Sequence, residues 1–413
     1  MIAGSAERRI LVLSQFYLPE PCAAAHRVRA LARALAAHGN HVTVLTAMPS
    51  FPDGRVRDGY RRKHFVEERD GDVHVHRVWA FASSRVTALT RLANWAAVAC
   101  GMLLYLLVRR QRNDVVIVSS PPITLAIPAL FAAWQSRGAL VADIRDVFPD
   151  VGVRMGRWSQ GGVLTRTLGT LADRLYARSS LVVAVTNTAR AAIVARRVPA
   201  AKVIVAMNGA DRVSVAREAV FSRTDGAFVI AYVGNMGVAT GLDALLDAAR
   251  ILPQNRFKFL LVGAGAQQDR LRTRVEREEI RNVDFLGVLP RENAARVLAD
   301  ANACIVPLAA GIRNSLPTKI FDALSVGCPV IVAAEGEARD FIVASGGGIC
   351  VPPEDGHALA SAICRLAEDR ALCERLSRSG REHLRSRYSR ATIMNDLAAR
   401  IVSGNLGHQT KAS

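Results

Sequence analysis

The chain has 413 residues, half of them apolar and 22% charged, and its formal net charge is +18. One hydrophobic core rarely extends beyond about 250–300 residues, so this length favours two domains, while the apolar content excludes an intrinsically disordered chain. The charge predicts an anionic partner, such as phosphate groups, nucleic acid or lipid headgroups. The seven cysteines are scattered and form no CxxC pair, which argues against a disulfide framework or a zinc site.

Short β-branched runs alternate with helix-period stretches through the first half of the chain, which predicts a parallel sheet in an α/β fold. Helical patterns include Ala23–His38 and Gly162–Ala177. Asp70-Gly71 lies between two further extended runs and predicts a β-hairpin added to this sheet. The expected parallel strands are Ile10–Leu13, Val42–Leu45, Val115–Val118, Leu140–Asp143, Leu181–Val185 and Val203–Ala206, and the hairpin strands are Arg62–Glu68 and Val73–Trp79.

The segment from Val86 to Val108 is the only one that approaches the length of a membrane span. A spanning helix needs about 20 predominantly apolar residues, and this segment carries Arg91 and Asn94, so it is borderline. Three alternatives stay open: a spanning helix, a core helix, and a helix in the membrane interface with Trp95 and Tyr105 at headgroup depth.

The strand–helix pattern pauses after Asn208-Gly209-Ala210-Asp211 and resumes near Thr224, which predicts an interdomain linker. A second sheet is then expected, and Ser389–Val402 is predicted as a closing amphipathic helix. The expected strands of the second sheet are Phe228–Val233, Phe257–Val262, Val283–Phe285, Ala303–Val306, Val330–Val332 and Gly348–Val351.

Two glycine loops follow consecutive strands of the second sheet. Gly234-Asn235-Met236-Gly237 and Gly263-Ala264-Gly265 each precede a helix, where backbone amides can face a phosphate. Ligands of open α/β sheets bind beyond the carboxyl ends of strands, so both loops are candidates for phosphate binding. A purely structural turn is the alternative for either loop.

A third candidate lies in the segment Gly311–Leu324. Pro317 suits the first turn of a helix, so Lys319 is expected near the positive helix N-terminus, and Asp322 falls one turn further along. A mobile cation beside backbone donors suits a diphosphate, and a carboxylate suits ribose hydroxyls. A surface Lys–Asp pair is the alternative.

In the first domain, Asp143, Arg145, Asp146 and Asp150 follow an expected strand. Arg145 is a candidate contact for a donor phosphate, and Asp146 a candidate to orient an acceptor hydroxyl or to accept its proton. The alternative is a buried Arg–Asp pair that only shapes the loop.

Several segments together resemble the family 4 retaining glycosyltransferases. The resemblance runs across nearly the whole chain and is greatest to the subgroup that builds O-antigen, capsule and exopolysaccharide repeats, which includes the fucosamine transferases. The segments that carry it are residues 14–20 (SQFYLPE), 39–46 (GNHVTVLT), 119–122 (SSPP), 145–150 (RDVFPD), 208–211 (NGAD), the helix around Lys319, 327–330 (GCPV) and 351–355 (VPPED).

The resemblance implies the glycosyltransferase-B fold, with two facing Rossmann-like domains and a cleft between them. Residues 1–207 would bind the acceptor, with a helix at 388–405 packing back on them, and residues 208–387 would bind a nucleotide-sugar, commonly a UDP-sugar. It further implies transfer to a lipid-linked or saccharide acceptor without cofactor or metal, with Arg145, Asp146 and Lys319 as the catalytic candidates. The expected donor-binding residues are Gly234, Asn235, Gly237, Thr240, Gly263, Gly265, Asn314, Leu316, Pro317, Lys319 and Asp322, and the expected acceptor contacts are His26 and Arg27.

The sequence departs from the family pattern at four positions of the donor site and in the glycine loop of the first domain. Residues 21–27 (PCAAAHR) replace that loop and leave His26 or Arg27 as candidate acceptor or phosphate contacts. The family's two glutamates fall on Asn314 and Asp322, and its glycine-loop arginine and lysine fall on Asn235 and Thr240. These losses keep two alternatives open, a catalytically silent binding protein and a sugar-nucleotide epimerase of the same fold. The tripeptide Asp70-Gly71-Asp72 matches a metal-binding motif of other glycosyltransferases, but the predicted hairpin turn accounts for these residue types.

The basic segments Arg55–Lys63 and Arg109–Arg112 predict contact with an anionic membrane surface. Nucleic acid is not expected as a partner, because no aromatic-interleaved or zinc-type module appears. The expected location is therefore cytoplasmic and peripheral, on the inner face of the bacterial inner membrane.

Overall fold

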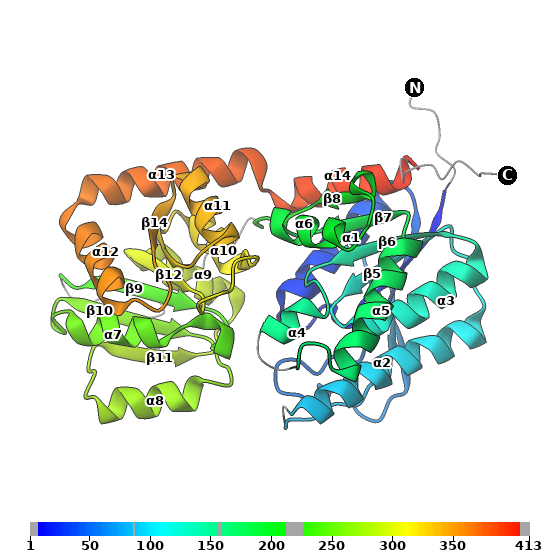
Figure 1. Cartoon of the computed structure of the whole chain (residues 1–413), viewed down its shortest axis with the longest axis horizontal. Helices are drawn as coiled ribbons and strands as arrows, with labels where there is room; N and C mark the ends of the chain where they lie inside the picture. The colour runs from blue at the N-terminus through cyan, green and yellow to red at the C-terminus, as the bar shows by residue number, and fades with distance from the viewer. Residues whose placement is uncertain (1–6, 86, 155–157, 212–225, 405–413) are drawn as a thin grey trace. The chain divides into compact units, whose positions relative to one another are not determined.

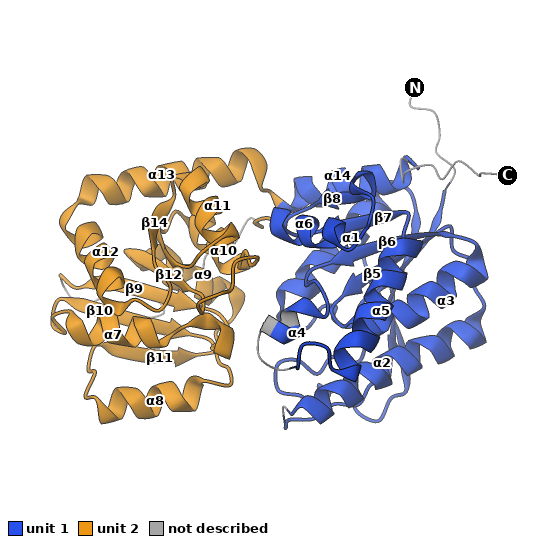
Figure 2. Cartoon of the chain, viewed as in Figure 1, with its two compact units in different colours: residues 1–208, 390–413 blue, residues 209–389 orange. Residues whose placement is uncertain are grey.

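A computed structural model of the chain describes residues 7–85, 87–154, 158–211 and 226–404 (Figure 1). The chain divides into two compact units, coloured separately in Figure 2. Unit 1 comprises Met1–Asn208 and Arg390–Ser413, and unit 2 comprises Gly209–Ser389. The expected linker through Thr224 falls outside the described residues.

Unit 1 is built on an eight-stranded sheet in the order β3-β4-β2-β1-β5-β6-β7-β8. All neighbouring strands are parallel except β3 and β4, which form the predicted hairpin with Asp70 opposite Val73. Strand β1 is central, with β2 on one side and β5 on the other. The topological switch point therefore lies between β1 and β5. The strands are β1 (Arg9–Leu13), β2 (His41–Ala47), β3 (Phe65–Asp70), β4 (Val73–Val78), β5 (Val115–Ser120), β6 (Ala139–Ile144), β7 (Leu181–Ala184) and β8 (Val203–Val205).

Helices cover both faces of this sheet, as alternate residues of the buried strands require. Ile10 and Val12 of β1 face α1 and α14, whereas Leu11 and Leu13 face the core formed with α2, α3 and α5. The helices are α1 (Ala23–Ala37), α2 (Ala88–Arg109), α3 (Ala126–Ser136), α4 (Asp150–Arg154), α5 (Val163–Arg178), α6 (Asn187–Ala195) and α14 (Arg390–Val402), with 3-10 turns at Ile123–Leu125 and Ala200–Lys202.

Helix α14 comes from the far end of the chain and packs on α1. Met394, Leu397 and Ile401 are buried against Val28 and Leu31, so residues beyond unit 2 complete the core of unit 1. The predicted closing helix is thereby confirmed within one residue of its expected start.

Unit 2 contains a six-stranded, fully parallel sheet in the order β11-β10-β9-β12-β13-β14. Its strands are β9 (Phe228–Val233), β10 (Phe257–Val262), β11 (Val283–Gly287), β12 (Ala303–Pro307), β13 (Val330–Ala333) and β14 (Gly348–Val351). Its helices are α7 (Asp243–Ile251), α8 (Gln268–Arg277), α9 (Arg291–Asp300), α10 (Thr318–Val326), α11 (Glu337–Ser345), α12 (Gly356–Glu368) and α13 (Arg370–Arg387), with a 3-10 turn at Val238–Thr240. This is the strand order of a dinucleotide-binding fold, so the expectation of two Rossmann-like domains is confirmed.

Helix α2 is, among the described residues, the one helix long and apolar enough to cross a membrane by length and composition. Thr87 caps its N-terminus, where its side chain accepts from the Thr90 amide, and Arg110 ends it in a left-handed conformation. Only 22% of its most apolar 18-residue stretch is buried in the structure. The helix is therefore neither a fully buried core element nor a surface helix of ordinary polarity.

Candidate functional site

The switch point of the unit 2 sheet lies between β9 and β12, which are neighbours in space but not in sequence. The glycine loop after β9 and the segment leading from β12 into α10 flank this point. Parallel sheets place their ligand sites beyond the carboxyl ends of strands at such a switch point. The topology therefore brings the sequence-predicted donor residues of both segments to one edge of unit 2.

A hydrogen bond between Lys319 and Tyr232 links the two sides of the switch point. Lys319 lies in the first turn of α10, and its Nζ donates to Tyr232 Oη at 2.8 Å. Tyr232 is fully buried near the end of β9, and its hydroxyl in turn donates to the backbone oxygen of Asn235 at 2.6 Å. The lysine is thus held over the glycine loop by a neutral side chain.

Gly234 allows this approach. Its φ of 147° lies in the region that favours glycine, and a Cβ there would be 2.8 Å from both Cε and Nζ of Lys319. Any side chain at this position would displace the ammonium group. The glycine is therefore required for the position of the cation, independently of any contact that its amide makes with a phosphate.

Burial lowers the pKa of Lys319 to about 8, against the effects of Cys304 and Asp322, which raise it. The Cys304 thiol beneath it is fully buried, and burial raises its pKa to about 12, so this neighbour stays neutral. A desolvated ammonium group gains more from an incoming anion than a solvated one. The arrangement suits the binding of a diphosphate, whose charge would restore the pKa of the lysine.

The second glycine loop packs directly on the first. A Cβ at Gly263 would lie 2.0 Å from the Gly234 oxygen, and one at Gly265 would lie 2.5 Å from Asn235 Oδ1. The Met236 amide donates to the Ala264 oxygen at 2.9 Å. Packing between the loops thus accounts for Gly263 and Gly265, which supports the structural alternative for this loop.

Asn235 and Thr240 occupy the positions of the missing loop cations. Asn235 is exposed, while the Thr240 hydroxyl donates to the Gly237 oxygen at 2.6 Å. The Thr240 side chain therefore stabilises the 3-10 turn after the loop and supplies no charge. Gly237 is the residue directly before that turn.

The segment before α10 is anchored to the next loop of the sheet. The Glu337 amide donates to the Arg313 oxygen at 2.8 Å, and a Cβ at Gly336 would lie 2.1 Å from that oxygen. Leu316 is buried, whereas Asn314 and Asp322 are half-buried. Pro317 caps α10 rather than opening its first turn, so the predicted helix start moves by one residue.

In unit 1 the structure places Arg27 and Asp143 together in the core. Arg27 Nη2 lies 2.7 Å from Asp143 Oδ1, and both side chains are essentially inaccessible. Arg27 also donates to the Met207 oxygen, and the Ser119 hydroxyl donates to the Asp143 carboxylate. The prediction of Arg27 as an acceptor contact is not supported, because its guanidinium is buried in this pair and has no accessible surface. His26, the other expected acceptor contact, is half-buried on α1.

Arg145 follows β6 and bridges to the end of β5. Its Nη2 donates to the Pro121 oxygen at 2.8 Å, and its Nε is buried without a hydrogen-bond partner. Burial lowers the pKa of Arg145, while Asp143 and Asp146 raise it. Asp146 itself is exposed. The carboxyl ends of β5 and β6 therefore hold a cation with an unused donor beside an accessible carboxylate.

Glu20 is a buried carboxylate that sequence analysis did not single out. Its Oε1 accepts from the amides of Ser50 and Phe51 at 3.0 Å, and its Oε2 is buried without a partner. Burial raises its pKa against these hydrogen bonds. The side chain fixes the loop after β2 through these two hydrogen bonds. The only sequence feature that could have pointed to it is its place between Pro19 and Pro21.

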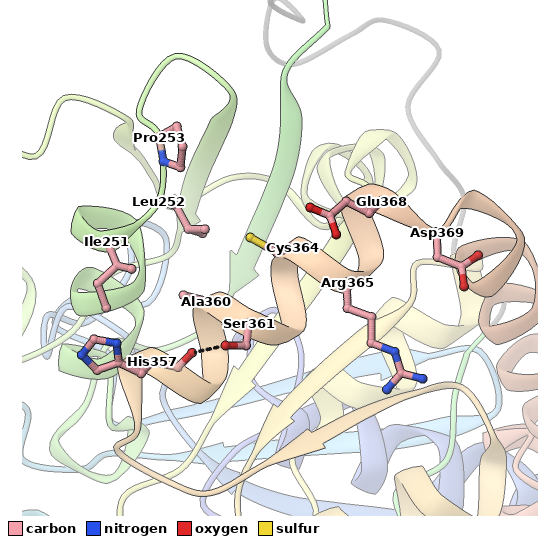
Figure 3. A pocket seen from close by; sticks show the side chains of 10 residues that line it. All are labelled: Ile251, Leu252, Pro253, His357, Ala360, Ser361, Cys364, Arg365, Glu368 and Asp369. Carbon is pink, nitrogen blue, oxygen red and sulfur yellow. Dashed lines mark hydrogen bonds between the residues drawn. The ribbon is translucent and has the colours of Figure 1, made fainter.

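A hollow of about 650 Å³ lies on unit 2 between the end of α7 and helix α12 (Figure 3). Its lining includes Ile251, Cys364 and Glu368 and none of the expected donor residues. It is remote from the carboxyl ends of the strands, so we assign it no role in the reaction. Among the described residues no group of three or more His, Cys, Asp or Glu is placed to hold a metal ion.

Comparison with known proteins agrees with this geometry. Residues 23–209 match the family model described as "Glycosyl transferase 4-like domain", and residues 227–369 match "Glycosyl transferases group 1". The Escherichia coli (strain K12) protein WcaI, by name a colanic acid biosynthesis glycosyl transferase, is 24% identical over 86% of this chain and 91% of its own length. The amylovoran biosynthesis glycosyltransferase AmsK of Erwinia amylovora is 25% identical over 48% of this chain and 50% of its own.

Solved structures share the fold at low identity. Sucrose-phosphate synthase from Thermosynechococcus elongatus has a TM-score of 0.73 at 20% identity and covers 96% of this chain and 100% of its own. HepE of Anabaena, in complex with UDP-glucose, has a TM-score of 0.68 at 19% identity, with the same coverage.

Fold and family models together define a glycosyltransferase with the glycosyltransferase-B fold. The chain belongs to glycosyltransferase family 4, and its relatives support a role in polysaccharide biosynthesis. The expected family, fold and enzyme class are therefore confirmed.

Proposed function

We propose that the enzyme transfers a sugar from a UDP-sugar to a hydroxyl group of a lipid-linked saccharide, with retention of the anomeric configuration. The observation that carries the proposal is Lys319, whose partly desolvated ammonium group lies over Gly234 at the switch point of unit 2. HepE, which shares the fold, is described in complex with UDP and with UDP-glucose, and this supports uridine as the nucleoside of the donor.

In this reaction the bond from the anomeric carbon to the diphosphate oxygen breaks, and a bond from the same carbon to the acceptor oxygen forms. The acceptor proton passes to a base, for which the exposed Asp146 is the candidate of unit 1. The departing UDP gains negative charge, so a cation fixed at the diphosphate lowers the barrier. As the family resemblance implies, we expect no step to require a metal ion.

We assign the cationic role to Lys319, because Asn235 and Thr240 carry no charge where the resemblance to the family implies arginine and lysine. With two cations missing, we expect a larger share of diphosphate stabilisation to depend on this one side chain. Its loss should cost about 10²-fold in kcat/KM, the magnitude typical of one electrostatic contact to a developing anion.

We further propose that the enzyme works on the cytoplasmic face of the inner membrane, where a lipid-linked acceptor is accessible. The relatives WcaI and AmsK carry the names of exopolysaccharide pathways, which supports a cell-surface polysaccharide as the product. The net charge of +18 is consistent with work beside anionic lipid.

A thermal-shift screen against UDP, GDP, dTDP and ADP tests the donor site in the absence of any acceptor. We expect UDP to raise the melting temperature of the wild type and to raise that of Lys319→Ala much less at the same concentration, since stabilisation falls as the Kd rises. Stabilisation by another nucleotide would replace uridine in the proposal. A wild-type protein that responds to none would instead favour a catalytically silent homologue.

A further inference from the structure

The solvent side of α2 is a continuous apolar stripe. Leu89, Leu104 and Val108 are 77%, 62% and 80% exposed, although leucine and valine on a helix usually pack inward. Most of the exposed positions recur every three or four residues along about 30 Å of helix, and those before the closing Arg109 carry no charge. They are Leu89, Ala93, Ala96, Cys100, Leu104, Leu107 and Val108.

The other side of α2 is packed into unit 1. Val98, Met102 and Leu106 are buried in its core, and the helix contacts β2, β4 and α3. A helix that crossed a bilayer would have to leave these contacts and expose the core beneath it. The stripe therefore suits a flat apolar partner that covers one side of the helix.

The apolar surface extends from α2 onto its neighbours. A Cβ at Gly101 would lie 3.0 Å from the Trp79 oxygen, so the helix lies tightly against the end of β4. Trp79 and Phe65 are exposed there and line, with Leu104 and Val108, a hollow of about 470 Å³. On α3, which packs on α2, Trp134 is 76% exposed. Exposed apolar surface that extends over several elements marks an interaction site.

Arginine side chains border this surface. Trp79 also lines a second hollow, of about 650 Å³, together with Phe81 and three arginines, Arg55, Arg61 and Arg85. Three exposed arginines follow the stripe in the sequence: Arg109, Arg110 and Arg112. Neither α2 nor α3 contains an aspartate or glutamate. Apolar anchors, tryptophans and arginines on one face match the chemistry of an anionic bilayer interface.

We propose that this surface, the α2 face, binds an anionic phospholipid bilayer with α2 parallel to the membrane plane. We define the α2 face as the exposed stripe of α2, Trp79, Phe81 and Trp134, with the bordering arginines. A second copy of the chain fits less well, because a symmetric contact would bring the same arginines against each other. The inference gives the proposed membrane location a specific surface and specific contacts.

Flotation with vesicles tests the proposal without donor or acceptor. We expect the wild type to partition at least about tenfold more strongly into phosphatidylcholine mixed with phosphatidylglycerol than into phosphatidylcholine alone, and less at high salt. Leu104→Asp and Val108→Asp should each lower partitioning about tenfold or more, because each places a charge where an apolar side chain enters the interface.

Val343→Asp on α11 is the matched control, since Val343 is 69% exposed on unit 2 and outside the α2 face. It should leave partitioning unchanged, and melting temperatures should show that all three variants fold. Equal partitioning of Leu104→Asp, Val343→Asp and the wild type would overturn the proposal. So would a wild-type dimer that Leu104→Asp converts to monomer, because the face would then belong to self-association.

Quenching by brominated acyl chains adds a measurement of depth. Tryptophan fluorescence should fall on binding, and most of the loss should disappear in Trp79→Phe with Trp134→Phe, since Trp95 and Trp158 are half-buried against the core of unit 1. Undiminished quenching in this double variant would also overturn the assignment. Failure here leaves the nucleotide screen unaffected, because that screen uses soluble UDP and a residue of unit 2.

Discussion

The pKa of Lys319 predicts how UDP binding depends on pH. Burial holds this pKa at about 8 in the free protein, and a bound diphosphate should raise it. The ammonium form is then about nine tenths populated at pH 7 and about one tenth at pH 9. If only that form binds the diphosphate, the apparent Kd rises about tenfold between these values.

The sign of the pH dependence follows from the direction in which UDP binding shifts the pKa of Lys319. Because binding raises the pKa of a base, the complex takes up a proton, about half a proton per nucleotide at pH 8. Affinity is therefore nearly constant below pH 7 and is lost as the pH rises through 8. Titration calorimetry in two buffers with different ionisation enthalpies measures the affinity and the proton uptake together.

Lys319→Met is the control, because it keeps an apolar stem beside Tyr232 and removes the titrating group. Its weaker binding should show no step near pH 8, and any remaining slope would come from the nucleotide or from other groups. A wild-type Kd that is the same at pH 7 and pH 9, or a step of equal size in Lys319→Met, would refute the assignment of the cation.

Two further predictions concern packing. Gly234→Ala should weaken UDP binding about tenfold or more, because its Cβ would lie 2.8 Å from the lysine Nζ, whereas Gly226→Ala, also at positive φ but with open space around it, should not; equal affinity of both variants in calorimetry would contradict this. Arg27→Met should destabilise unit 1 by about 3–5 kcal/mol in thermal or denaturant unfolding, because it leaves the Asp143 carboxylate buried without its partner. Arg29→Met, which removes a partly exposed ion pair, should cost about 1 kcal/mol or less, and similar losses in the two arginine variants would remove the buried pair as the cause.

Local patterns were sufficient to predict most of the architecture. Buried parallel strands read as β-branched runs, so β1, β9 and β13 begin or end within one residue of expectation. The turn chemistry of Asp70-Gly71 predicted the hairpin of β3 and β4, and its carboxylate accepts from Arg29, Arg33 and Tyr17. The strands and the turn depend on residues close together in the chain, whereas the partners of the Asp70 carboxylate lie 37 to 53 residues away.

The site was less predictable, because its contacts join distant segments. Lys319 was expected beside a phosphate, but its partner Tyr232 lies 87 residues earlier and read only as the end of a strand. Arg27 looked available on α1, whereas its partner Asp143 lies 116 residues away. The Gly263 loop suggested phosphate binding because sequence does not show that another loop packs against it.

Helix α2 illustrates a different limit. Its composition was compatible with a span, a core helix or an interfacial helix, since periodicity is weak when both sides are apolar. Only the packing of Val98 and Met102 separates the buried side from the stripe that includes Leu104.

The return of α14 to unit 1 has a consequence for the order of synthesis. Residues 1–208 leave the ribosome with the α1 side of their sheet incomplete, because Met394, Leu397 and Ile401 are made only after unit 2. Unit 2 is complete in sequence by Ser389, before the helix that closes unit 1 emerges. A nascent chain stalled before Arg390 should therefore carry a finished second unit and a first unit that still needs chaperone protection.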